Sequence, residues 1–84
     1  MESTFFNKEL VHMDYDRKAL GKAISQRRIE AGFTQEVLSG LAGIRRSQLS
    51  LIETGATSVT LDTLWYIAEA LSVPLSTIIG EIEK

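Results

Sequence analysis

The strongest constraint on this fold is residues 34–55, TQEVLSGLAGIRRSQLSLIETG, which predict two short helices joined by a tight turn. Thr34 is a good N-cap, because its hydroxyl can accept a hydrogen bond from an amide of the first helical turn. Gly43 and Gly55 follow the two apolar stretches, and glycine readily adopts the left-handed conformation that ends helices. We therefore expect the second helix over about residues 45–54.

The two predicted helices differ in how much of their surface is apolar. In the first helix, an apolar stripe at helical spacing is expected to face the core: Val37, Leu38 and Leu41. In the second helix, only Leu49 and Ile52 share the inward face. The side chains expected to point away from the core are Arg46, Ser47, Ser50, Leu51 and Thr54. A short helix with a polar and cationic outer face is suited to contacting another molecule.

A longer pattern surrounds these two helices. It consists of Gly32-Phe33-Thr34-Gln35, residues 38–42, Ile44, Ser47, Leu49-Ser50, Ile52-Glu53-x-Gly55 and Leu61-x-x-Leu64-x-x-Ile67-Ala68-x-Ala70-Leu71-x-Val73. Over roughly residues 17–80, the chain resembles the phage-repressor and Cro type of helix-turn-helix transcription regulators, the XRE-like family. The resemblance implies an all-α, compact five-helix, lambda-repressor-like domain whose second helix of the pair enters the major groove of double-stranded DNA.

The resemblance also implies a set of DNA contacts. Gln35 would reach a backbone phosphate, helped by free amides at the positive end of its helix. Arg45 and Arg46 would contact phosphate or guanine; for Arg46, a base contact, a phosphate contact and plain solvation all remain open. The expected DNA-binding residues are Gln35, Arg45, Arg46, Ser47, Gln48, Ser50, Leu51 and Thr54.

Two of these residues depart from the family pattern. Arg45 stands at the cap position, where a small hydroxyl or carboxylate residue is usual, and this weakens the cap by about 1 kcal/mol. The exchange makes sense if a cation at that position gains a phosphate. Leu51 stands where a polar or basic side chain is usual. It would either rest against the methyl group of thymine or be one of the isolated exposed apolar residues common on protein surfaces.

Arg28 falls on the apolar face of a helix predicted over about residues 15–31 and capped by Asp14 or Asp16. A cation on such a face needs a partner. The resemblance gives Glu53 as that partner, in a buried pair that ties the first helix to the recognition helix. The alternative is an arginine whose head extends past the core into water.

Two further helices are predicted, over about residues 61–71 and from Pro74 to residue 80 or beyond. The first is expected to turn these residues to the core: Leu61, Leu64, Ile67, Ala68 and Leu71.

One such domain contacts too few base pairs to be selective, so we expect a homodimer on a palindromic operator. Its expected interface is Trp65, Tyr66, Ile79 and Ile82; the intramolecular core is the alternative, favoured for Ile78 and Leu75.

Composition excludes several classes of protein. The chain has 84 residues, enough for one small domain, expected over 14–84 after an extension at 1–13. With no cysteine and a single histidine, His12 in the extension, we expect no metal, no cofactor and no enzymatic activity. No signal peptide or membrane-spanning run is evident, so a cytoplasmic location is the default and no membrane partner is expected.

The extension itself remains ambiguous. It contains apolar residues that a disordered tail does not need: Phe5, Phe6, Leu10 and Val11. These side chains would pack on the domain or on a partner, or belong to a short strand or turn. The sequence does not decide between these alternatives.

Charge is unevenly distributed along the chain, although the net charge is only −2. Residues 17–46 contain seven basic and two acidic side chains, whereas residues 61–84 contain four acidic side chains and only Lys84 as a base. This predicts a basic half that faces DNA, against the alternative of an ordinary solvated surface. Together with this charge distribution, the resemblance implies a sequence-specific transcription regulator, a repressor or autoregulator. The alternative function is a protein-interaction module or an antitoxin-type protein that binds a toxin or another regulator.

Overall fold

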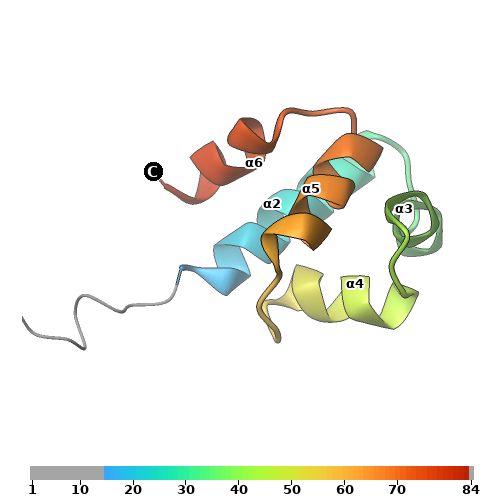
Figure 1. Ribbon diagram of the computed structural model, residues 1–84, viewed down its shortest axis with the longest axis horizontal. Coiled ribbons are helices and arrows are strands. Elements are labelled where there is room, and N and C mark those ends of the chain that lie inside the picture. The colour runs from blue at the N-terminus through green and yellow to red at the C-terminus, as the bar shows by residue number, and fades with distance from the viewer. Residues whose placement is uncertain (1–14, 84) are drawn as a thin grey trace, which may run out of the picture.

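Five helices and no strand make up residues 15–83, the part of the chain that the computed structural model describes (Figure 1). The helices are α2 (Arg17–Glu30), α3 (Gln35–Ala42), α4 (Arg46–Thr54), α5 (Leu61–Ala70) and α6 (Leu75–Ile82). The predicted all-α fold of five helices is confirmed. The predicted extension at residues 1–13 and His12 lie outside the described residues.

The helices begin and end where local side chains satisfy the backbone. Asp16 rather than Asp14 caps α2, and its carboxylate accepts a hydrogen bond from the Ala19 amide at 2.9 Å. Because Asp16 has an extended backbone, α2 begins at Arg17, two residues later than predicted. Thr34 caps α3 in the same way, accepting from the Val37 amide at 3.1 Å.

The core lies where α2 and α5 run between the other helices. In Figure 1, α4 lies along the lower edge of the molecule and α6 along the upper edge, with α2 and α5 between them. The main packing contacts join α2 to α4 and α6, and α3 to α4 and α5. The buried apolar cluster consists of Leu20, Ile24, Leu38, Ala42, Leu49, Ile52, Leu64, Ile67, Ala68, Leu71 and Ile78.

Three apolar residues predicted to face the core are exposed. Val37 and Leu41 are 45% and 59% exposed, because α3 packs through Leu38, Ser39 and Ala42 instead. The buried side of α3 therefore combines one large apolar residue, Leu38, with the small residues Ser39 and Ala42. Leu61 is 66% exposed. It stands in the first turn of α5, beside a groove that leaves this side chain uncovered.

The end of α4 lies almost in contact with the backbone of α2. A Cβ atom placed on Gly21 would overlap the carbonyl oxygens of Ile52 and Glu53, so only glycine allows this approach. At Gly55, φ is 77°, and an added Cβ would lie 2.8 Å from Lys18 Cγ. These two close approaches hold the C-terminal end of α4 against α2.

An ion pair joins α2 and α6, the first and last helices of the described chain. The Arg27 guanidinium of α2 lies 2.6 Å from a carboxylate oxygen of Glu81 in α6. The hydrogen bond to Glu81 raises the pKa of Arg27 above its usual value.

Within residues 15–83 no single helix is long and apolar enough to cross a membrane. The helices α5 and α6 meet both conditions only when taken together, as a pair bent by 113°.

Candidate nucleic-acid interface

The α3–α4 unit is a pair of short helices joined by a three-residue turn, Gly43 to Arg45. Gly43 has φ of 73°, and the Ile44 amide donates to the Ser39 carbonyl at 3.0 Å, which closes the end of α3. The Ile44 side chain is half-buried against the core and anchors the turn. This turn leaves α4 at the edge of the molecule, with one face against α2 (Figure 1).

The outer face of α4 carries nearly all the predicted contact residues. Leu49 and Ile52 are buried, and both face inward as predicted. The exposed residues of the turn and helix are Arg45, Arg46, Ser47, Gln48, Leu51 and Thr54, and Ser50 is half-buried. The Thr54 hydroxyl donates to the Leu51 carbonyl at 3.1 Å, so it has a partner within the helix. These residues of α4 and its preceding turn are therefore accessible on the outer side of the helix.

The N-terminus of α4 is electropositive for two reasons. Arg45 occupies the N-cap position, and its side chain makes no capping hydrogen bond within the described part of the chain. The first amides of a helix lack intrahelical acceptors and form the positive end of the helix dipole. Two guanidinium groups, those of Arg45 and Arg46, stand exposed at the same end. Amides and cations together favour the binding of an anion.

A buried ion pair holds α4 against α2. Arg28 Nε donates to Glu53 Oε2 at 2.8 Å, and Arg28 Nη2 donates to Oε1 at 3.1 Å. Arg28 Nη1 also donates to the Phe33 carbonyl at 2.9 Å. The two side chains are only 14% and 5% exposed. The predicted pair is confirmed, and the alternative of an arginine extending past the core into water is wrong.

Gln35 connects this ion pair to the start of α4. Its Nε2 donates to Glu53 Oε1 at 2.9 Å, and its Oε1 accepts a long hydrogen bond of 3.4 Å from Arg46 Nη1. The side chain that was predicted to reach a phosphate is thus engaged within the protein. A chain of hydrogen bonds runs from Arg28 through Glu53 and Gln35 to Arg46, and the sequence pattern did not indicate it beyond the first pair.

Ion pairs remove part of the predicted basic surface. Of the seven basic residues between positions 17 and 46, Arg27 is paired with Glu81 and Arg28 with Glu53. The basic residues that are exposed are Lys18, Lys22, Arg45 and Arg46. Within the described chain, no group of three or more metal-ligating side chains is present.

Lys18 is a candidate contact residue that the sequence reasoning missed. It belongs to α2, yet its backbone and Cγ lie against Gly55, at the C-terminal end of α4. Exposed cations therefore flank α4 at both ends, with Arg45 and Arg46 at one and Lys18 at the other. Only the close approach of α2 to α4 brings Lys18 to this place, and a single sequence carries no signal for it.

Comparison with known proteins agrees with this geometry. The family model described as "Helix-turn-helix" matches residues 24–78. The chain is 37% identical over 61 residues to the HTH-type transcriptional regulator SutR of Escherichia coli; the match covers 73% of this chain and 34% of SutR, about a third of that relative's length. It is 37% identical over 57 residues to the HTH-type transcriptional regulator y4dJ of Sinorhizobium fredii, covering 68% of this chain and 74% of y4dJ.

A solved structure supports the same assignment. The restriction-modification controller protein C.AhdI of Aeromonas hydrophila superposes with a TM-score of 0.74 at 28% identity, over 75% of this chain and 96% of that protein. The named relatives are transcriptional regulators, a kind of protein that is not an enzyme. By the family match, the relatives and the fold, the chain belongs to the XRE-type helix-turn-helix family of DNA-binding transcriptional regulators.

Proposed function

We propose that this protein is a sequence-specific regulator that represses transcription, including that of its own gene, by occupying a promoter with α4 in the major groove. The observation that carries the proposal is the outer face of α4, which is exposed along its length and electropositive at its N-terminus. A helix that enters the groove by its N-terminal end brings such residues to the base edges. α6, whose single carboxylate Glu81 is paired with Arg27, lies on the opposite edge of the molecule from α4 (Figure 1).

Within this arrangement, Arg46 is the residue that reads a base. Arginine binds guanine through two parallel hydrogen bonds, to O6 and N7. Gln35, held by Glu53 at 2.9 Å, limits the orientations of the Arg46 guanidinium before DNA arrives. Arg45, the first amides of α4 and Lys18 contact phosphates, while Ser47, Gln48 and Ser50 supply further polar contacts.

Leu51 contacts the methyl group of thymine in the same half-site. It is 50% exposed, although it stands in the middle of a helix that packs on the core. Apolar contact with the thymine methyl is one of the ways in which proteins distinguish bases in the major groove. Thr54, one turn further on, lies nearer the phosphates of the other strand.

The protein binds a palindromic operator as a homodimer, which brings two copies of α4 to half-sites about one helical turn apart. Trp65 and Tyr66 are 53% and 51% exposed on α5 and form the centre of the proposed interface. Ile79 and Ile82, predicted from the sequence for the same interface, are half-buried and pack against the core of their own chain.

The test begins with selection of binding sites from random DNA by the purified protein. On the selected operator, Arg46→Ala is expected to weaken binding by about 1–3 kcal/mol and to relax specificity at one base pair. Gln35→Ala should relax specificity at that same base pair, and the double variant should lose little more than Arg46→Ala alone, because the two side chains act as a unit. Glu69→Ala, an exposed change on α5, is the control. Failure to select any sequence would contradict sequence-specific binding.

Leu51 requires a separate measurement. Leu51→Ala is expected to weaken binding to the selected operator by less than Arg46→Ala does. The loss of affinity caused by Leu51→Ala should vanish on an operator whose contacted thymine is replaced by uracil. Uracil lacks only the methyl group. An unchanged DNA affinity together with loss of a protein partner would instead favour the protein-interaction function.

Dimerisation is tested by sedimentation at micromolar concentration, with and without operator DNA. The parent protein is expected to sediment as a dimer. The double variant Trp65→Ala, Tyr66→Ala is expected to dissociate into monomers more readily. Monomers alone under both conditions would contradict the proposed assembly without affecting the assignment of α4.

A further inference from the structure

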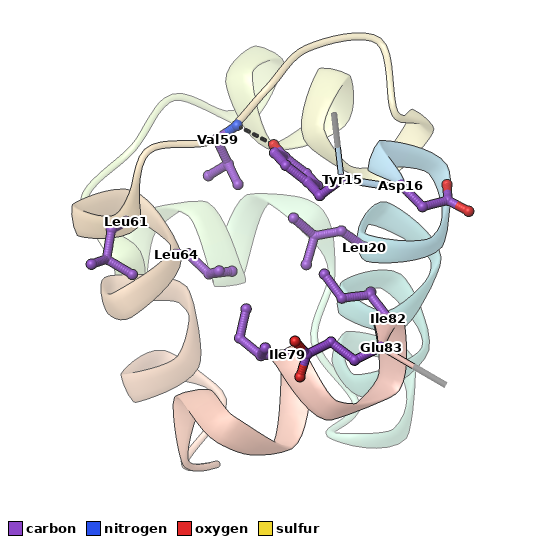
Figure 2. A pocket seen from close by; sticks show the side chains of 9 residues that line it. All are labelled: Tyr15, Asp16, Leu20, Val59, Leu61, Leu64, Ile79, Ile82 and Glu83. Atoms are coloured by element: carbon purple, nitrogen blue, oxygen red, sulfur yellow. Dashed lines mark hydrogen bonds between the residues drawn. The ribbon is translucent and has the colours of Figure 1, made fainter. Parts of the chain in front are cut away.

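An apolar groove lies on the side of the molecule formed by α2, α5 and α6. Its volume is about 500 Å³, and its walls include Leu20, Val59, Leu64, Ile79 and Ile82. Figure 2 shows these side chains gathered around one hollow, with Leu20 on α2, Leu64 on α5 and the two isoleucines on α6. The DNA-binding face of α4 contributes no residue to this groove.

The chain enters the described structure at this groove. Tyr15, the first described residue, forms part of its wall, and its hydroxyl accepts a hydrogen bond from the Val59 amide at 2.9 Å (Figure 2). Whatever precedes Tyr15 therefore begins at the edge of the groove. We propose that residues 1–14 of the same chain cover the groove and place apolar side chains in it.

The composition and length of the segment fit this role. Within residues 1–14, four large apolar side chains fall in seven positions: Phe5, Phe6, Leu10 and Val11. A cavity of roughly 150 Å³ accommodates benzene, so the groove has room for about three groups of that size. Because an extended chain spans at most about 3.3–3.6 Å per residue, Phe6, nine residues before Tyr15, reaches up to about 30 Å from it.

Two other occupants fit less well. Asp16 and Glu83 stand among the groove residues, and these carboxylates oppose a nucleic acid. A second copy of the chain would have to compete with a tethered segment, whose effective concentration is on the order of millimolar for a short tether. At micromolar protein concentration, the segment of the same chain therefore occupies the groove first.

This assignment changes the surface available for dimerisation. Ile79 and Ile82, half-buried in the described chain, become internal once the groove is covered. The exposed pair Trp65 and Tyr66 lies outside the groove and remains accessible. The extension is then part of the folded domain.

The experiment uses a spin label on the full chain. Because the protein has no cysteine, Ser3→Cys provides a single attachment site beside the two phenylalanines. In methyl NMR spectra, the label is expected to abolish the signals of Val59, Ile79 and Ile82. The methyl groups of Val37 and Leu41, on a helix that contributes no residue to the groove, should keep their intensity. Adding Phe5→Ala and Phe6→Ala to the labelled chain should restore the groove signals.

A mixing experiment distinguishes the segment of the same chain from the segment of another copy as the occupant of the groove. Methyl-labelled chains without a spin label are combined with spin-labelled chains that carry no methyl label. Intact groove signals in the mixture, with loss only in the doubly labelled chain, support the proposal. Loss of groove signals in the mixture shows that another copy supplies the occupant and overturns it. Intact groove signals in every sample, or loss that persists after both phenylalanines are removed, would also overturn it. None of these outcomes depends on DNA binding.

Discussion

Replacing Glu53 with glutamine removes one charge from the most connected side chain of the α2–α4 contact and changes little in its shape. Three N–H groups converge on the carboxylate, from Arg28 Nε at 2.8 Å, Arg28 Nη2 at 3.1 Å and Gln35 Nε2 at 2.9 Å. An amide has a single oxygen. In either orientation of the new side chain, its NH2 group must face at least one of these donors.

The loss follows from the burial of the pair. Glu53 and Arg28 are 5% and 14% exposed, so little water can reach the place of the missing partner. Removing one member of a buried pair leaves the other charge uncompensated and is destabilising by about 3–5 kcal/mol. For a domain of this size, 1 kcal/mol shifts Tm by about 4–8 °C, so Glu53→Gln is expected to lower Tm on the order of 20 °C.

Urea unfolding of the full chain, followed by circular dichroism, measures the free energy of unfolding. Glu69→Gln, an exposed change on α5 that removes the same charge, should stay within about 0.5 kcal/mol of the parent protein. The double variant Arg28→Met, Glu53→Met should be far less destabilised than the sum of its single variants, because the second change removes a stranded charge. If Glu53→Gln also unfolds within about 0.5 kcal/mol of the parent, the reasoning from a buried, uncompensated charge is refuted.

Two further predictions concern backbone positions and use the same unfolding assay. Gly21→Ala is expected to destabilise the protein by about 1–3 kcal/mol or more, because the added methyl overlaps two carbonyl oxygens at the end of α4. The matched change Gly40→Ala has nothing within 4 Å of the new methyl and should stabilise α3 by about 0.5–1 kcal/mol. Ser72 has φ of 58° after α5, so Ser72→Gly should raise the unfolding free energy by about 1 kcal/mol; a loss of stability would contradict the strain assigned there.

Much of the fold could be predicted because its signals are local. Thr34, Gly43 and Gly55 mark helix ends through their own chemistry, and the structure has caps or left-handed turns at all three. The pair of Arg28 and Glu53 was predicted by the resemblance, since an arginine on an apolar face requires a partner.

The errors arose where packing between helices decides the outcome. Periodicity placed Val37 and Leu41 inside because they are large and apolar, whereas α3 buries Ser39 and Ala42, whose small side chains permit close contact. Leu61 continues the stripe of α5 in sequence, but among residues 15–83 no helix covers the first turn there, and its side chain is 66% exposed. The position of Lys18 beside Gly55 likewise depends on the approach of α2 to α4 at a glycine.

The contacts around α4 are distributed unequally between its two ends, and this bears on how the helix would read DNA. At its C-terminal end, Glu53 pairs with Arg28, Gly21 lies against two α4 carbonyls and Gly55 lies against Lys18. At its N-terminal end, Arg45 to Gln48 are exposed, and the Arg46 side chain donates a hydrogen bond of 3.4 Å to Gln35. Because Gln35 is itself held by Glu53, hydrogen bonds connect the carboxylate at one end of the helix to the arginine at the other. Glu53 would therefore couple the stability of the domain to the geometry of the proposed base contact of Arg46, although its own side chain is only 5% exposed.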